Sequence, residues 1–235
     1  MDKESVQTKI HVTSINKSVV VYKYGTGQRR ILLVHGWSGR GTQLCKIAAE
    51  LVKKDFEIIS FDAPAHGKSK GSQTIMLEFI ATIHQIAEIY GPFEAAVGHS
   101  LGGMSLLAAV DRGLKINKLV TIGAADKVSD IMIDFVRKLK LKPIQSELLR
   151  ELFEATYKET MESLSGSVSA KGVTIPVLVI HDQDDAEVSV GCAVQIEMTL
   201  SNGQLMITQG LGHRKILGDR GVVAAVSRFI VASLK

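Results

Sequence analysis

The residues most suited to chemistry form the run Gly-His-Ser-Leu-Gly at positions 98–102. A mostly apolar run at residues 94–97 precedes it, and a run rich in alanine and leucine, residues 101–110, follows. This order predicts a strand that turns sharply into a helix, with Ser100 at the apex and glycines where a Cβ would collide with the turn. A hydroxyl displayed at a helix N-terminus, where negative charge is favoured, is suited to be a nucleophile. Because Gly-x-Ser-x-Gly also occurs by chance, a serine at an ordinary strand–helix turn is the alternative.

A serine hydroxyl is a poor nucleophile until a base removes its proton, and the base needs an acid that orients it. His213 is the predicted base, because the glycines on both sides of it let an imidazole reach over the strand ends. The acid is expected in the acidic loop at residues 181–187, which contains Asp182, Asp184 and Asp185. A metal site is the competing use of these carboxylates, but the loop lacks the glycine and the spacing of a calcium loop. We therefore expect no metal.

The other six histidines are expected to have structural roles. His35 and His66 follow strand ends, and we expect them to brace loops through hydrogen bonds. His99 is adjacent to Ser100, but its side chain is expected to point away from the turn. The remaining three are not candidates for the base: His11, His84 and His181.

Short apolar runs alternate with helical patterns over most of the chain, which predicts a mostly parallel α/β sheet covered by helices on both faces. Residues 10–15 and 19–24 are expected to form an antiparallel hairpin that leads into the sheet. In such sheets, ligands bind beyond the carboxyl ends of the strands, and the loops named above all fall there. The expected strands are residues 31–34, 56–61, 94–97, 119–122, 175–180 and 205–207. The expected helices are residues 44–51, 75–89, 101–110, 192–200 and 222–234.

The alternation stops between residues 124 and 172, where no strand pattern is present. Residues 128–139 have the apolar spacing of an amphipathic helix, and residues 148–161 suggest a second one. Residues 163–172 are rich in serine and glycine and are expected to form a loop.

Length and composition exclude several classes of protein. The chain has 235 residues, 46% hydrophobic residues and a net charge of +4, as expected of one globular domain over residues 1–235. Basic residues form no stripe with interleaved aromatics, so no nucleic-acid partner is expected. Cys45 and Cys192 are expected to be free thiols. No secretory signal and no apolar run of about 20 residues is present, so we expect a cytoplasmic protein with no membrane partner. The oligomeric state is left open.

Several motifs, in the same order along the chain, resemble the α/β-hydrolase superfamily over nearly the whole sequence. They are His-Gly-Trp at residues 35–37, Asp-Ala-Pro-Ala-His-Gly-Lys-Ser at residues 62–69, and the nucleophile turn at residues 98–103. Ala65 replaces a glycine that is usual in the second motif. In the acidic loop the family pattern Gly-x-x-Asp places Asp182 at the glycine and Asp185 at the acid.

The resemblance implies an oxyanion hole made by the backbone N–H groups of Trp37 and Leu101, and it implies that Asp185 is the acid. Asp184 and Asp182 remain alternatives, as does Asp126, because some members carry the acid one strand earlier. The resemblance also implies that residues 124–172 form a small helical cap over the site, and that no cofactor is needed.

These residues lead us to expect a serine hydrolase that cleaves small, largely apolar carboxylic esters or thioesters through an acyl-serine intermediate. Other readings of the same fold are a slow or non-catalytic ligand-binding sensor, a peptidase and a carbon–carbon bond hydrolase. A dehalogenase is disfavoured, because that chemistry uses a carboxylate at the position of Ser100.

Overall fold

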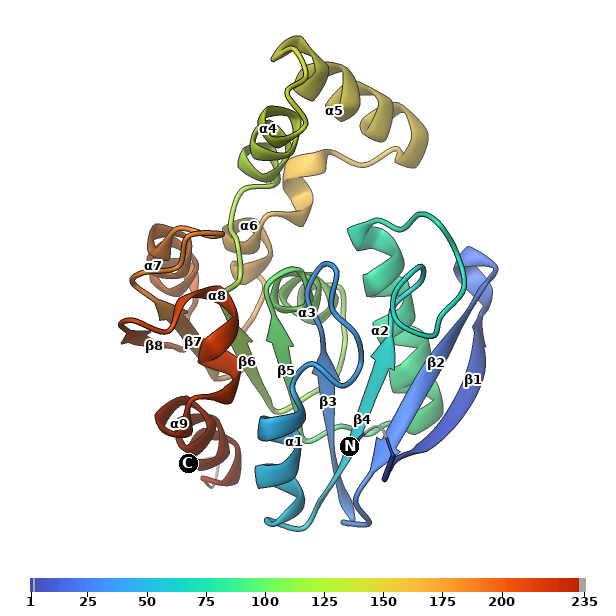
Figure 1. The fold of residues 1–235 in the computed structure, drawn as a ribbon, viewed down its shortest axis with the longest axis vertical. Coiled ribbons are helices and arrows are strands. Elements are labelled where there is room, and N and C mark those ends of the chain that lie inside the picture. The colour runs from blue at the N-terminus through green and yellow to red at the C-terminus, as the bar shows by residue number, and fades with distance from the viewer. Residues whose placement is uncertain (2, 233–235) are drawn as a thin grey trace.

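The computed structural model describes residues 1 and 3–232 and contains an eight-stranded sheet with helices on both faces (Figure 1). The strand order is β1-β2-β4-β3-β5-β6-β7-β8. β2 pairs antiparallel with β1 and β4, and the other neighbouring strands pair in parallel. The prediction of a mostly parallel α/β sheet is confirmed. The strands are β1 (Val6–Val12), β2 (Lys17–Tyr24), β3 (Arg29–Val34), β4 (Phe56–Asp62), β5 (Ala95–His99), β6 (Lys118–Ile122), β7 (Val177–Asp182) and β8 (Gly203–Thr208).

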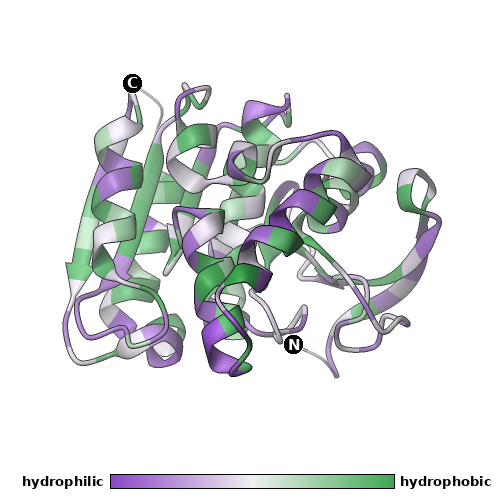
Figure 2. Cartoon of the chain, turned by 90° about the horizontal axis from the view of Figure 1, so that it is seen from above, coloured by the Kyte–Doolittle hydropathy of each residue, from purple (hydrophilic) through white to green (hydrophobic). Residues whose placement is uncertain are grey.

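From β3 onward, helices fill the connections between the strands, and two hydrophobic clusters join helices to the sheet. α1 and α9 pack on one face, and α2, α3, α6 and α7 lie over the other. Seen from above, the helices carry both hydrophobic and hydrophilic residues, as expected when each buries one side (Figure 2). The helices are α1 (Cys45–Val52), α2 (Met76–Tyr90), α3 (Leu101–Asp111), α4 (Val128–Lys138), α5 (Ile144–Tyr157), α6 (Gly166–Ala170), α7 (Val190–Thr199), α8 (Gly212–Lys215) and α9 (Arg220–Val231), with 3₁₀ turns η1 (Thr13–Ile15), η2 (Met161–Leu164) and η3 (Ile216–Gly218).

The register of the parallel strands brings the candidate site together. Val34 pairs with Gly98, Ile122 with Ile180, and Asp182 with Thr208. Consequently the loops after β3, β5, β6, β7 and β8 begin at nearly the same level of the sheet. The carboxyl edge therefore gathers the segments that sequence patterns single out, as the rule for open parallel sheets predicts.

Residues 124–172 contain α4, α5, η2 and α6, and no strand occurs in this segment, all of which the structure describes. α4 and α5 extend above the carboxyl edge of the sheet (Figure 1). Hydrogen bonds fasten the lower part of the segment, from Ser129 N–H to Glu162 (2.9 Å) and from Ser167 N–H to Asp126 (2.7 Å). In contrast, α5 has no buried residue.

The prediction of a loop at residues 163–172 is wrong, because η2 ends there and α6 follows. The small residues that suggested a loop are instead required for close packing. Gly166, Ser169 and Ala170 are buried, and a Cβ at Gly166 would lie 2.8 Å from the Ile196 side chain. Tertiary contact therefore overrides the weak helix propensity of serine and glycine.

The other predicted elements are found with shifts at their ends: residues 13–15 form η1 instead of strand, and residues 158–161 lie beyond the end of α5. The N-terminal hairpin forms, with β1 and β2 joined by η1 and by Asn16 in the left-handed region (φ 50°). The last helix begins at Arg220, and Leu234, where we expected it to end, lies outside the described residues. In the part of the chain that the structure describes, no helix has the length and apolar character needed to cross a bilayer.

Candidate active site

The turn between β5 and α3 displays Ser100 in a strained backbone conformation. Ser100 has φ 52° and ψ −122° and precedes the first residue of α3. A Cβ at Gly98 would lie 2.6 Å from the carbonyl group of Gly102, and a Cβ at Gly102 would lie 2.5 Å from the carbonyl oxygen of Val34. Both glycines are thus required by close backbone approach, and the predicted strand–turn–helix around Ser100 is present.

His213 and Asp185 are joined by a hydrogen bond of 2.7 Å between Nδ1 of the imidazole and Oδ2 of the carboxylate. Because a carboxylate only accepts, Nδ1 carries a proton, and in the neutral imidazole Nε2 then keeps its lone pair. The Asp185 side chain is 1% exposed, and its Oδ1 accepts the backbone N–H groups of Glu187 and Val188. Burial acts to raise the pKa of this carboxyl, but hydrogen bonds from His181, His213 and these two N–H groups hold the pKa well below its usual range.

Two features place the His213 imidazole beside the Ser100 turn. The His99 ring, immediately before Ser100, lies 4.6 Å from the His213 ring between centroids, and its Nε2–H donates to the His213 carbonyl (2.9 Å). On the other side, a Cβ at Gly123, just beyond β6, would lie 3.3 Å from the imidazole. His213 is therefore enclosed by the ends of β5 and β6 and is only 8% exposed.

The alternative acids make other contacts. Asp182 is fully buried and binds the loop that precedes His213, and Asp184 accepts the Gly210 N–H (2.9 Å). Asp126 accepts the Ser167 N–H and so anchors α6. Of the four carboxylates considered from the sequence, Asp185 alone has a hydrogen bond to His213 among the described residues.

On the opposite side of Ser100, two histidines hold the segment that contains Trp37. His35 Nδ1–H donates to the Gly36 carbonyl (2.7 Å) while its Nε2 accepts the Ala63 N–H (3.0 Å). His66 Nε2 accepts the Ser38 N–H (3.1 Å). The prediction that both histidines brace loops is confirmed. Burial lowers the pKa of His35 to about 4, which keeps this ring neutral and able to accept.

The backbone N–H groups of Trp37 and Leu101 donate to no other group in the described part of the chain. Leu101 is the first residue of α3, where an N–H has no partner within the helix. The Trp37 segment also lies close to the nucleophile turn, since a Cβ at Gly36 would be 2.9 Å from the Ser100 Cβ. Both N–H groups are therefore unused by other described residues, and both belong to segments next to Ser100.

The loop after β4 contains the motif at residues 62–69, in which Ala65 replaces the usual glycine. Asp62 is buried and accepts the Tyr22 hydroxyl (2.7 Å) and the N–H groups of Gly41 and Lys68 (both 2.6 Å). Ala65, where the motif has glycine, adopts φ 60°. A residue other than glycine is strained at this positive φ, which explains physically why glycine is usual at this position.

Sequence reasoning missed the contacts of His99 and His181. His181 is fully buried, and its Nε2–H donates to the Val188 carbonyl (3.0 Å) and lies 3.3 Å from Asp185 Oδ2. His99 was expected to point away from the turn, and the sequence did not reveal its hydrogen bond to the His213 carbonyl. Their position at the ends of buried strands was the available signal, because a polar residue there needs a partner in a neighbouring loop.

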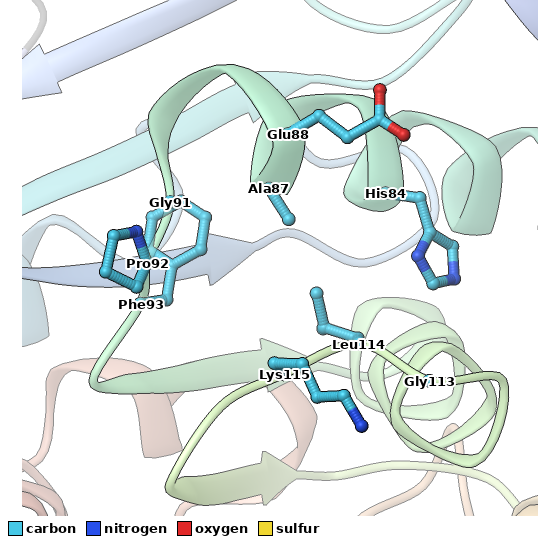
Figure 3. Close-up of a pocket in the computed structure, with 9 residues that line it drawn as sticks. All are labelled: His84, Ala87, Glu88, Gly91, Pro92, Phe93, Gly113, Leu114 and Lys115. Atoms are coloured by element: carbon cyan, nitrogen blue, oxygen red, sulfur yellow. The ribbon is translucent and has the colours of Figure 1, made fainter.

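A surface hollow lined by residues of α2 and of the segment after α3 lies apart from these groups (Figure 3). Its lining includes His84, Glu88, Pro92 and Lys115 and none of the predicted site residues.

Comparison with known proteins agrees with the fold. A model described as alpha/beta hydrolase fold matches residues 29–143, and one described as TAP-like protein matches residues 156–233. No curated protein matches the sequence. Similar solved structures include a bromoperoxidase from Bacillus anthracis (17% identity, TM-score 0.75, 97% of this chain and 100% of that one). They also include an esterase from Exiguobacterium antarcticum (15% identity, TM-score 0.74, 97% of this chain and 100% of that one). A third is a thioesterase domain from the curacin biosynthetic pathway (15% identity, TM-score 0.71, 97% of this chain and 99% of that one).

At these identities, the likeness to solved structures demonstrates the fold. The two family models fall on either side of residues 144–155, and together they match the strands from β3 to β8. Taken with the fold, they support a hydrolase, and the chain belongs to the alpha/beta hydrolase superfamily.

Proposed function

We propose that the chain is a serine hydrolase that cleaves small, largely apolar carboxylic esters or thioesters through an acyl-Ser100 intermediate. The observation that carries the proposal is the 2.7 Å hydrogen bond between His213 and Asp185, beside the strained turn that displays Ser100. This arrangement leaves Nε2 of His213 free to act as a base.

In the proposed reaction, Ser100 Oγ attacks the substrate carbonyl carbon while His213 Nε2 takes the hydroxyl proton. The oxyanion accepts the N–H groups of Trp37 and Leu101, and one such donor is typically worth roughly 3–4 kcal/mol. His213 then gives its proton to the leaving alcohol or thiol. Water, deprotonated by His213, then attacks the acyl carbon, the bond from Ser100 Oγ to that carbon breaks, and His213 returns the proton to Oγ as the acid leaves. The buried negative charge of Asp185 stabilises the imidazolium in both halves.

The preference for apolar groups rests on side chains above the carboxyl edge. Trp37 lies in the segment that His35 and His66 hold, and it is 57% exposed. On α4, Ile131 and Phe135 are 39% and 49% exposed, which is unusual for residues of this type. We propose that residues 124–172 act as a cap and that such side chains, with Met132 and Phe153, contact the acyl or alcohol group.

The test is labelling of the purified chain by a fluorophosphonate probe, with the modified residue located by mass spectrometry. We expect an adduct on Ser100 in the unaltered chain, and none in Ser100→Ala or His213→Ala. An adduct that persists in His213→Ala would contradict the proposed base. Absence of labelling in folded protein would contradict the hydrolase and favour a ligand-binding protein on the same fold, which ligand-induced shifts in melting temperature would then reveal.

Hydrolysis of p-nitrophenyl esters of increasing chain length, and of the matching thioesters, tests the substrate class. We expect steady turnover after an acyl-enzyme burst and a higher kcat/KM for apolar acyl groups than for charged ones.

A further inference from the structure

We propose that Asp182 is a positioning residue that holds the loop of His213, defined as residues 209–212, in the geometry that the base requires. The inference rests on the proposed function, because Asp182 acts through His213. It concerns the residue that stands where the family pattern has glycine, and a glycine side chain makes no such contact.

The Asp182 carboxylate lies at the last position of β7 and is fully buried. Its Oδ1 accepts the N–H groups of Asp184 (3.0 Å) and Gly212 (2.9 Å). Its Oδ2 accepts the Thr208 hydroxyl (2.7 Å) and the Leu211 N–H (3.1 Å). Leu211 and Gly212 are the two residues immediately before His213, so the carboxylate binds the backbone that carries the imidazole.

The same residue is also connected to the acid. The main-chain carbonyl of Asp182 accepts the Asp185 N–H (3.2 Å), so the side chain of Asp182 binds the base loop while its backbone binds the turn of Asp185. Neighbouring Asp184 adds a single contact to the base loop, at Gly210 (2.9 Å). Asp182 therefore binds both the loop that carries His213 and the turn that carries Asp185.

A carboxylate suits this position better than an amide. All four partners are donors, and an asparagine would turn an NH₂ group toward one pair of them. Burial acts to raise the pKa of Asp182, but the hydrogen bonds from Thr208, Gly212, Leu211 and Asp184 outweigh it and lower the pKa below its ordinary value. The group is therefore ionised at neutral pH and accepts at both oxygens.

The experiment compares Asp182→Asn and Asp182→Gly with Asp184→Asn. The control variant removes a charge from the acidic loop, as Asp182→Asn does, but it affects only one hydrogen bond to the loop of His213. Near-UV circular dichroism and thermal melting establish that each variant folds. With p-nitrophenyl butyrate, we expect Asp182→Asn to lower kcat roughly 10- to 100-fold with KM changed less than about threefold, since misplacement of a catalytic group affects the chemical step. Asp184→Asn is expected to change kcat less than about threefold.

A second readout does not depend on activity. In ¹⁵N-histidine-labelled protein, the Nδ1–H proton shared with Asp185 is expected to give a low-field proton signal, identified by its loss in His213→Gln. We expect the signal in the unaltered chain and in Asp184→Asn, and its loss or broadening in both Asp182 variants. Should Asp182→Asn fail to fold, Asp182→Gly and Thr208→Val decide, because neither introduces a clashing donor.

Folded Asp182 variants that keep both the signal and kcat within about threefold would overturn the inference. If the unaltered chain neither labels nor hydrolyses esters, the proposed function fails instead. The proton signal then still decides whether Asp182 positions His213.

Discussion

The carboxyl edge of the sheet and the helices α4 and α5 are neighbours built in opposite ways. At the edge, the buried carboxylates of Asp62, Asp182 and Asp185 each accept at least two backbone N–H groups. On α5 no residue is buried, and apolar side chains are 55–63% exposed at Ile144, Leu148 and Leu152. Directional polar contacts fix atoms to fractions of an ångström, whereas an exposed apolar surface tolerates change. Under the proposed function, the carboxyl edge sets the chemistry and the helices above it set substrate preference.

The largest effect is expected from Ser100→Ala, which should lower kcat roughly 10⁴- to 10⁶-fold. The variant should keep its melting temperature or gain stability. The reason is that the turn is held by the hydrogen bond from the Ser100 N–H to the Ile122 carbonyl (2.9 Å), which the substitution leaves in place. Steady-state hydrolysis and thermal melting check this. Residual activity above a few per cent of that of the unaltered chain would show that Ser100 is not the nucleophile.

Asp185→Asn should lower kcat about 10³- to 10⁴-fold, since an amide cannot fix the tautomer of His213 or stabilise its charged form. Asp184→Asn is the matched control, with an exposed side chain and no contact to the imidazole among the described residues. Equal losses in the two variants would mean that the acid is not Asp185.

Acid should weaken the edge through its buried histidines. Burial lowers the pKa of His35 and His99 to about 4, below the unfolded value of about 6.5. Between these values the unfolded chain binds protons that the folded chain does not, so the free energy of unfolding falls as pH drops from 6.5 toward 4. The loss is on the order of 3 kcal/mol for each histidine at pH 4.

Urea unfolding at pH 7, 5.5 and 4.5 measures this loss. His99→Gln, which keeps a donor for the His213 carbonyl but does not titrate, should flatten the dependence on pH. An unchanged slope would mean that the ring is not buried as neutral imidazole.

Two leucines offer a matched test of how the two regions differ in stability. Leu119 in β6 is fully buried and Leu152 in α5 is 63% exposed. Leu119→Ala should lower the free energy of unfolding by about 2–5 kcal/mol, because it leaves a cavity. Leu152→Ala should change it by less than about 0.5 kcal/mol. A comparable loss at Leu152 would show that α5 is packed against something in solution.

A small, stabilising effect is expected at Ala65, where relief of the positive φ should let Ala65→Gly stabilise the chain by up to about 1 kcal/mol. Chemical denaturation at neutral pH measures it. Destabilisation would mean that the larger conformational entropy that glycine gives to the unfolded chain outweighs the relief of strain in the folded chain.

Much of the fold was predictable because period and turn chemistry are local. Continuous apolar runs identify strands buried on both faces, and the glycines around Ser100 follow from close backbone approach. The prediction of a loop at residues 163–172 failed because local composition does not reveal the tertiary contacts that bury residues of α6. Likewise, the sequence shows an aspartate at 182 in place of glycine but not the four donors around it.

The amino-acid sequence by itself determined the parallel sheet, the turn that displays Ser100, and the loops from which a base and an acid would come, because these depend on neighbours along the chain. Only the tertiary structure decided that Asp185 binds His213, that Asp182 binds the backbone before His213, and that His99 contacts His213 while His181 contacts Asp185. Those contacts join residues from separate strands, and hydrogen bonds depend on separations of about 3 Å that residue spacing along the chain does not specify.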